Sequence, residues 1–185
     1  MKKICLGLSL SNLLISLAII SILLTATTPS LTGIINKQHA SAIMDKLGTL
    51  IYFTRQQAIT SNTYTTLCPS KDLISCVNDW GEQLILFTDH NKNEIVDGRD
   101  TVLRVSTLTS EHSGYLTLNT AGKKYLQFNS RGHSNGKWGN LTYCPFNHDL
   151  TLARRLIINR TGRVRYEKDS NGDGIIDTST PLQCE

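Results

Sequence analysis

The longest apolar stretch of the chain lies near its N-terminus. Residues 5–28 carry no charged side chain and directly follow the basic start with Lys2 and Lys3. A helix rises about 1.5 Å per residue, so about 20 such residues span the roughly 30 Å core of a bilayer. The pattern predicts a membrane-spanning helix that starts in the cytoplasm and leads to a domain outside it. A cleaved secretory signal is the alternative, with TATTPS at 25–30 as its cleavage site.

Beyond Pro29 the apolar residues recur at spacings of three and four, with charged residues between them. This spacing places one apolar stripe on one side of a helix, which can then pack against a globular domain. The residues of the stripe are Leu31, Ile34, Ile35, Ala42, Ile43, Leu47, Leu50 and Ile51.

Past about residue 61 the pattern changes to short β-rich runs separated by turn residues. The predicted strands are 63–68, 83–89, 101–108, 114–119, 125–129, 140–146, 154–159 and 162–167. Several alternate apolar and polar residues, as half-buried antiparallel strands do. The NRTG segment that ends at Gly162 predicts a hairpin turn between the last two. The fold class is therefore α+β, with a β-rich domain over 61–185 and no internal repeat.

Composition and cysteines refine this picture. The 185 residues suffice for one domain of ordinary size with an appendage, and the net charge of +4 is too mild to indicate nucleic acid by itself. Cys5 precedes the apolar run and the other cysteines follow it, as expected if only the later part reaches an oxidising compartment. Disulfides are favoured over zinc because the spacings lack the close pairs that zinc ligands form. Three pairings are open to Cys68, Cys76, Cys144 and Cys184.

Positive charge is concentrated between residues 154 and 168. Six cations face a single acidic residue, Glu167, in this segment: Arg154, Arg155, Arg160, Arg163, Arg165 and Lys168. In a strand that starts at Gly162, Arg163 and Arg165 point to one face, about 7 Å apart, a spacing comparable with successive phosphates of one DNA strand. Arginine suits bidentate phosphate contacts, and glycine allows a tight turn or a close backbone approach. The alternative is a solvated edge strand, whose charges prevent aggregation.

An acidic segment follows directly. Its oxygen-bearing side chains match the first nine positions of a calcium loop, with Gly174 at the sixth: Asp169, Asn171, Asp173 and Asp177. The twelfth position is Thr180 instead of a bidentate Glu, so a glycine-rich turn is the alternative to a calcium site. The segment DHNKNEIVD at 89–97 has the same spacing but Glu94 in place of glycine, which favours a hairpin loop.

Enzymatic interpretations are weak. GHSNG at 132–136 satisfies G-x-S-x-G, but no helix pattern follows it, as a nucleophile elbow requires. The histidines show no metal-binding spacing. Three aromatic residues, Trp80, Trp138 and Tyr166, are candidates for stacking on bases, although packing in the core or a turn is the more common use.

The N-terminal order resembles a type IV pilin or pseudopilin. A basic leader ends at Gly7, an uncharged helix begins at Leu8, Pro29 follows some twenty residues on, and a cysteine-bearing β domain comes after. The resemblance implies cleavage between Gly7 and Leu8 by a prepilin peptidase, methylation of the new N-terminus, and a pilin helix over 8–60 that spans the membrane to about residue 28. It departs from the family at Asn12, where members carry a glutamate thought to pair with a neighbour's N-terminal amine during assembly.

The rest of the chain resembles the GspH/FimT family of pseudopilins. The segments that carry this resemblance are FTRQQAITSN, CPS...C...W, LILFTDHNKNEIVDGRDTVLRV, FNSRGHSNGKWGNLTYCP and ARRLIINRTGRVR. The resemblance implies an extended N-terminal helix packed on two antiparallel β-sheets. It also implies a single-pass protein of the inner membrane with its C-terminal domain in the periplasm, which joins other pilins in a pilus or pseudopilus.

The resemblance to FimT-type members gives the arginines a role. Those members carry a GRxR motif near the C-terminus and bind DNA during natural transformation, and here Gly162, Arg163 and Arg165 supply that motif. GspH-type members act instead as structural subunits of type II secretion, which is the alternative. No cofactor other than calcium is expected. We expect disulfides Cys68–Cys76 and Cys144–Cys184, the second of which ties the chain end to a sheet.

Overall fold

The computed structural model describes residues 9–81, 83–108, 114–120, 122, 124–136, 138–178, 182 and 184, without the side chains of 24–32. The predicted cleavage site at Gly7 and Leu8, and Thr180, lie outside the described residues. The chain divides into two units, 1–38 and 39–185. The helix α1 (Leu10–Thr60) contributes to both units.

The described side chains of α1 in the first unit are exposed. Leu10, Leu14 and Ile22 are each more than half accessible to solvent, and Asn12 is also exposed in this stretch. Over the part of the chain that the structure describes, no helix combines the length and the apolar composition that a membrane crossing requires.

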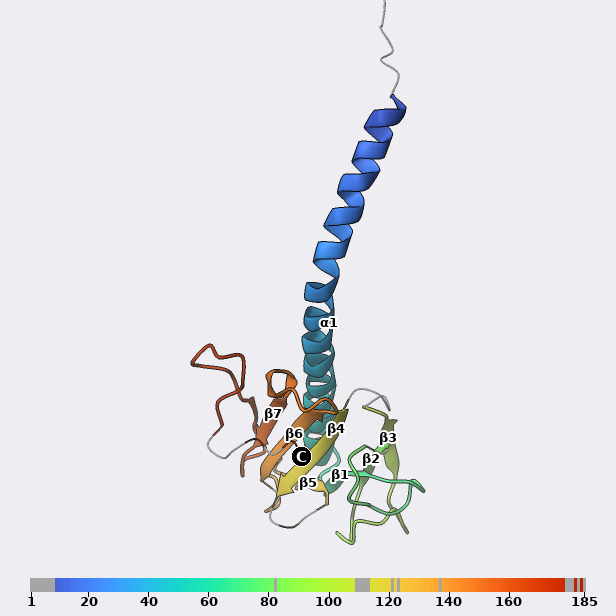
Figure 1. Ribbon diagram of the computed structural model, residues 1–185. Helices are drawn as coiled ribbons and strands as arrows, with labels where there is room; N and C mark the ends of the chain where they lie inside the picture. The colour runs from blue at the N-terminus through green and yellow to red at the C-terminus, as the bar shows by residue number, and fades with distance from the viewer. Residues whose placement is uncertain are drawn as a thin grey trace, which may run out of the picture. The chain divides into compact units, whose positions relative to one another are not determined.

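The second unit contains the last part of α1 and two antiparallel sheets (Figure 1). The first sheet has the order β3-β2-β1-β5, from strands β1 (Thr65–Pro69), β2 (Leu84–Thr88), β3 (Val102–Ser106) and β5 (Leu126–Phe128). The second has the order β4-β6-β7-β8, from strands β4 (Gly114–Thr120), β6 (Gly139–Pro145), β7 (Arg154–Ile158) and β8 (Val164–Tyr166). A short 3-10 helix, η1 (Leu150–Leu152), precedes β7. The α+β class and all eight predicted strands are confirmed.

One core joins α1 to both sheets. The helix buries four residues of the predicted stripe, Ile43, Leu47, Leu50 and Ile51. Three other residues of that stripe, Ile34, Ile35 and Ala42, are exposed. The first sheet contributes Leu67, Leu84, Leu86, Leu126 and Phe128 to this core, and the second contributes Leu116, Leu141, Tyr143, Leu156 and Ile158. The compact unit therefore starts at His39, inside the helix.

A second apolar cluster lies on the outer face of the second sheet, away from α1. It contains Cys144, Ala153 and Cys184, with Tyr115, Leu150 and Leu182 against them. Both expected disulfides are confirmed, since the structure joins Cys68 to Cys76 and Cys144 to Cys184. The second disulfide ties Cys184 to the part of the outer face near Cys144.

Candidate nucleic-acid interface

The predicted hairpin turn joins β7 to β8. The Gly162 N–H donates to the Asn159 carbonyl at 2.9 Å, and the Asn159 side-chain oxygen accepts from the Arg163 N–H at 2.9 Å. Gly162 has a φ of +77°, which glycine adopts without strain. The turn holds the start of β8, and the two arginines of the GRxR motif, in a fixed backbone conformation.

A second turn repeats this geometry between β5 and β6. The Gly132 N–H donates to the Asn129 carbonyl at 2.8 Å, and the Asn129 side-chain oxygen accepts from the His133 N–H at 3.1 Å. Gly132 has a φ of +74°. The shared pattern Asn-x-x-Gly at 129–132 and 159–162 is a local repeat that we missed in the sequence because it covers only one turn. We call the two together the paired turns.

The paired turns touch each other and the helix. A Cβ on Gly162 would collide with the Gly132 carbonyl oxygen, and that oxygen accepts a hydrogen bond from Arg55 Nε of α1 at 2.9 Å. The buried Ser134 hydroxyl donates to the Asn159 carbonyl at 3.1 Å. Backbone from both sheets and the end of the helix therefore meet at one point, which the glycines permit because they have no side chain.

The paired turns also explain Ser134, the serine of the G-x-S-x-G segment. This serine is 1% exposed and bonded to the neighbouring turn, so it is not presented to a substrate.

The six cations of the 154–168 segment fall into two groups. Exposed side chains belong to Arg160, Arg163, Arg165 and Lys168, and the structure shows no hydrogen bond or ion pair for them with any described residue. Val164 packs against the core, so Arg163 and Arg165 share the outer face, as the strand pattern predicts.

The other two arginines are engaged inside the protein. Arg155 is 7% exposed, donates to the Thr142 hydroxyl at 3.0 Å and lies 3.9 Å from the Glu167 carboxylate. Arg154 donates to the backbone carbonyls of Thr151 and Ala153. Arg155 is buried and Arg154 is half-buried with Nη1 bonded to the backbone, so we do not include them in the candidate interface. Gly162 is buried and shapes the turn without offering a side-chain contact.

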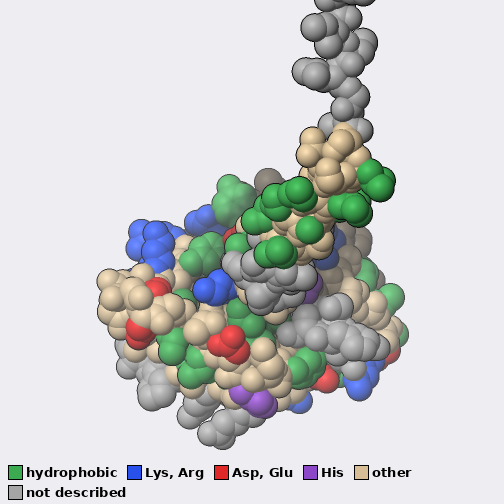
Figure 2. All heavy atoms as spheres, turned by 45° about the horizontal axis from the view of Figure 1, so that its top comes forward, with side chains coloured by type: hydrophobic (Ala, Val, Ile, Leu, Met, Phe, Trp, Pro, Cys, Tyr) green, Lys and Arg blue, Asp and Glu red, His purple; other side chains and the backbone are tan. Residues whose placement is uncertain are grey.

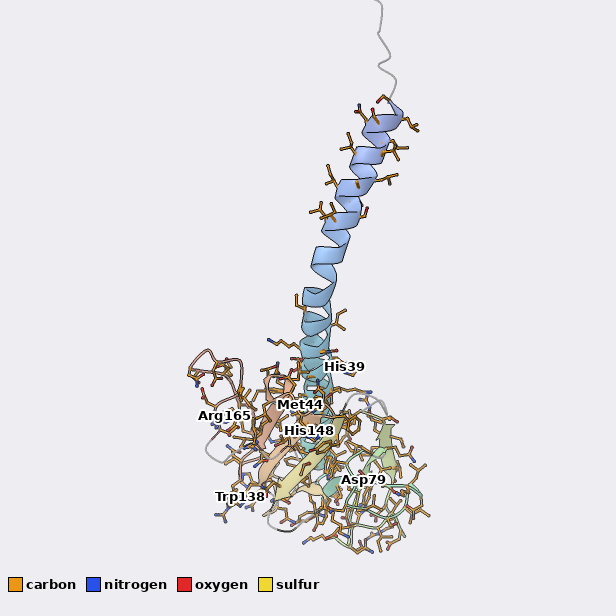
Figure 3. The ribbon with its side chains drawn as sticks, viewed as in Figure 1. His39, Met44, Asp79, Trp138, His148 and Arg165 are labelled. Carbon is orange, nitrogen blue, oxygen red and sulfur yellow. A yellow bond between two sulfur atoms is a disulfide. The ribbon has the colours of Figure 1, made fainter. Side chains whose placement is uncertain are left out.

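Strand register places further residues beside Arg163 and Arg165. Ile157 of β7 faces Arg165 of β8 and Asn140 of β6. Two residues after Ile157, the Asn159 N–H donates to the Arg163 carbonyl. Directly opposed residues share a face of a sheet, so these side chains lie on one surface. We call this surface the open half-face, and define it by Trp138, Asn140, Ile157, Arg163 and Arg165; Figure 3 labels Trp138 and Arg165 on the same flank of the domain.

The aromatic residues named from the sequence occupy different environments. Trp80 is buried at 2% exposure. The Tyr166 hydroxyl lies 3.5 Å from the Met44 carbonyl of α1, and burial, with Asp45 nearby, raises the pKa of Tyr166. Trp138 is 59% exposed, and the structure shows no ring contact or hydrogen bond for it with another described residue. Of these three aromatic residues, Trp138 is the most exposed.

The acidic loop after β8 is held by its own backbone. The Asp169 carboxylate accepts from the N–H groups of Gly172 and Gly174 at 2.7 Å each, and these bonds lower the pKa of Asp169. Asp173 accepts from the Ile175 N–H, Asn171 donates to Asp173, and Asp177 accepts from the Ser170 N–H. Within the described residues, no group of three or more His, Cys, Asp or Glu side chains is arranged to hold a metal ion. Calcium binding stays a prediction.

The loop at 89–97 connects the antiparallel strands β2 and β3, as the hairpin interpretation predicts. Glu94 in this loop adopts a φ of +65°. The buried Asp89 carboxylate supports this turn by accepting from the N–H groups of Asn93 and Glu94 and from the side chains of Thr66 and Gln127. Asp89 therefore anchors a structural loop between β2 and β3.

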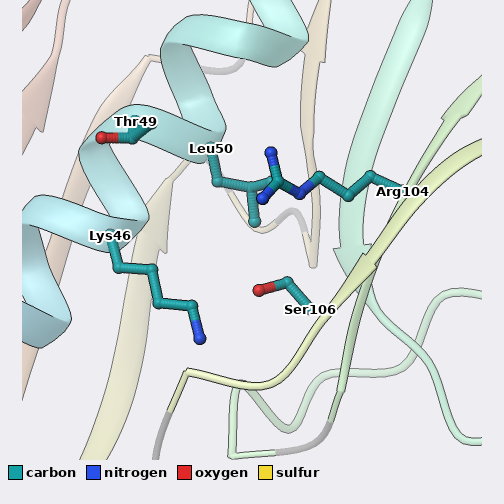
Figure 4. Close-up of a pocket in the computed structure, with 5 residues that line it drawn as sticks. All are labelled: Lys46, Thr49, Leu50, Arg104 and Ser106. Atoms are coloured by element: carbon teal, nitrogen blue, oxygen red, sulfur yellow. The ribbon is translucent and has the colours of Figure 1, made fainter.

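A small hollow lies between α1 and β3 (Figure 4). Its volume is about 160 Å³, and its lining is Lys46, Thr49, Leu50, Arg104 and Ser106. The Lys46 ammonium donates to the Thr107 carbonyl, and the Thr49 hydroxyl donates to the Asp45 carbonyl. The described lining contains no acidic group or imidazole.

A long helix whose second part packs on two antiparallel sheets defines a pilin-type fold. The model of the family described as type II transport protein GspH matches residues 44–162, which is most of the chain. The chain belongs to the GspH family. The protein is therefore a minor pilin or pseudopilin. Membership of this family implies association with a pilus or pseudopilus.

Solved structures share the fold. The type IV minor pilin FimU of Pseudomonas aeruginosa matches in two crystal forms. The first is 19% identical over 69% of this chain and 91% of that one, with a TM-score of 0.52. The second is 17% identical over 71% and 90%, with a TM-score of 0.56. The minor pseudopilin EpsH of the Vibrio cholerae type 2 secretion system is 14% identical over 66% and 90%, and its TM-score of 0.45 is too low to carry an argument. The comparison with curated proteins finds no match.

Proposed function

We propose that this minor pilin binds DNA through the arginines of the GRxR motif during natural transformation by a type IV pilus. The observation that carries the proposal is the pair Arg163 and Arg165, whose side chains are exposed on one face of an edge strand and make no hydrogen bond or ion pair with a described residue. Arg160 of the turn and Lys168 beyond the strand add positive charge at the two ends of the pair. Guanidinium groups in this arrangement contact phosphates irrespective of base sequence.

The proposal includes the maturation of the chain. Prepilin peptidase would cut between Gly7 and Leu8, and the apolar helix to about residue 28 would anchor the protein in the inner membrane before assembly with other pilins. The C-terminal domain would then lie in the periplasm. Asn12, in place of the family's glutamate, retains hydrogen bonding but cannot neutralise a neighbour's N-terminal amine.

The double substitution Arg163→Ala with Arg165→Ala tests DNA binding. We expect affinity for duplex DNA in a mobility shift assay to fall about 10- to 100-fold, because two charge-assisted phosphate contacts are lost. The slope of log affinity against log salt should become shallower by about 1.8, or roughly 0.9 for each contact.

A matched control removes two cations elsewhere. Arg99 and Lys124 are exposed and lie on other loops. Arg99→Ala with Lys124→Ala changes the net charge equally and should cost less than threefold. If the two double variants lose affinity equally, the effect is one of net charge and the GRxR site is refuted.

The first of the paired turns supplies an additional cation. Arg131 is exposed, and its turn contacts the GRxR turn through Gly132 and Ser134. We expect Arg131→Ala to weaken duplex binding about three- to tenfold, whereas Arg131→Lys, which keeps the charge, should lose less. Titrations of both variants at several salt concentrations measure this. Equal losses for alanine and lysine would show that the guanidinium geometry, and not the charge alone, makes the contact.

The alternative is a structural subunit of a pilus or type II secretion pseudopilus that does not bind DNA. One observation favours it: the family match ends at residue 162, so Arg163 and Arg165 lie beyond it. This function predicts that gene deletion abolishes piliation or secretion, and that the purified protein shifts no DNA.

The DNA-binding assay can also test whether the acidic loop binds calcium. Figure 2 shows acidic and basic side chains close together at the left of the domain. Asp169, Asp173 and Asp177 are exposed and would oppose an approaching phosphate. If calcium binds there, it should raise DNA affinity at constant ionic strength, and Asp173→Ala should remove that gain. An unchanged affinity would mean that the loop is a turn alone.

A further inference from the structure

Trp138 exposes a large, mainly apolar ring to water. The chain contains two tryptophans, and the other, Trp80, is 2% exposed, against 59% for Trp138. Tryptophan is enriched at interfaces, because its ring offers a large apolar surface together with one hydrogen-bond donor. The question is which ligand suits this position.

The register places Trp138 next to the arginine turn. Gly139, the first residue of β6, faces Ile158 of β7, so Trp138 stands across from Asn159. Asn159 in turn bonds to Arg163 at 3.0 Å. Neighbouring strands lie about 4.8 Å apart, so the backbones of Trp138 and Arg163 are separated by two strand spacings, about 10 Å. Long side chains easily bridge this distance.

The orientation of the strands puts the ring and the guanidinium groups on one side. Ile158, which neighbours Asn159, is fully buried in the core, so Asn159 and the residues opposite it face outward. Tyr166 shares β8 with Arg165 but points the other way, toward the Met44 carbonyl of α1. Among the described residues of the open half-face, Trp138 is therefore the aromatic side chain available beside the arginines.

We infer that the open half-face binds single-stranded nucleic acid, with one base stacked on Trp138 and the adjoining phosphates held by Arg163 and Arg165. This inference rests on the proposed function, and it specifies that the DNA is bound as a single strand. An unpaired base offers both faces of its ring, whereas bases inside a duplex are stacked on each other and offer none. Stacking platforms flanked by cations are how single strands are bound without sequence preference. Asn140, on the same face, adds an amide for a sugar or base edge.

Tryptophan fluorescence of the full-length chain in detergent tests the inference. Trp80 is shielded by the core, so a change on titration reports Trp138. We expect a short oligothymidylate to quench the emission, and a closed DNA hairpin of equal charge to leave it nearly unchanged. Quenching by neither probe, with both bound, would overturn the inference while leaving the proposed function intact. Binding of neither probe would overturn both.

Substitutions of Trp138 distinguish a loss of base stacking from a loss of folding. Trp138→Ala should weaken oligothymidylate binding about tenfold and hairpin binding less than twofold. Trp138→Phe, which keeps a ring, should retain most of the affinity. Phe146→Ala is the control, because Phe146 is 52% exposed but contacts Tyr115 near the covered part of the face; it should change neither affinity. Equal losses for both probes in Trp138→Ala would refute base stacking.

Discussion

Removing the disulfide between Cys144 and Cys184 by alanine substitution of both residues is expected to lower the free energy of unfolding by about 4 kcal/mol. The bond closes a sequence separation of 40 residues, and releasing it gives the unfolded chain the corresponding freedom. In the folded protein it holds the chain end, where the Cys184 carbonyl lies 2.8 Å from His148 Nδ1. Denaturant unfolding followed by circular dichroism measures the loss.

The other disulfide provides the comparison. Cys68 and Cys76 are separated by 8 residues, so their removal should cost only about 2.5 kcal/mol by the same loop argument. The difference between the two double variants tests whether loop length sets the contribution of each bond. If the shorter loop proves equally important, packing around Cys68 in the first sheet outweighs chain entropy.

Replacing Gly162 with alanine is expected to destabilise the protein by about 3 kcal/mol. Alanine in a left-handed backbone conformation costs about 1 kcal/mol, and displacing the Gly132 carbonyl from its packed position adds about 2 kcal/mol. Thermal and denaturant unfolding measure the loss.

Gly136 is the matched control for Gly162. It has a φ of +72°, yet nothing lies within 4 Å of the place its Cβ would take. Gly136→Ala should therefore lose only the backbone term of about 1 kcal/mol. If both glycine variants lose the same stability, the contact between the paired turns contributes nothing, and the turns are held by their own hydrogen bonds.

Much of the fold could be predicted because its signals are local. The spacing of Ile43, Leu47 and Ile51 defined the buried side of the helix, and alternation defined the strands to within two residues. The shared face of Arg163 and Arg165 followed from the period of a strand. These features depend on neighbours in sequence, which a pattern can show.

The sequence pattern could not distinguish the arginines that are bonded inside the protein from those whose side chains are free to contact DNA. Arg155 is buried because Thr142, on another strand, and Glu167, beyond β8, both meet it. The contact between the turns at Gly132 and Gly162 depends on two sheets that come together. Trp138 was one of three aromatic candidates in the sequence, and the register that places it opposite Asn159 is what brings it near the arginines. Such contacts depend on tertiary structure, and the sequence near each residue does not indicate them.

The contact of Arg55 with the paired turns has a mechanical consequence. If DNA bound to Arg163 and Arg165 is pulled by a filament, the pulling force acts on β8. The rest of the fold must then transmit that force. The backbone at Gly162 bears on the Gly132 carbonyl, and that carbonyl is tied to Arg55 of the helix. Tension therefore has a short path from β8 into α1, and it need not pass through the disulfide-bound tail.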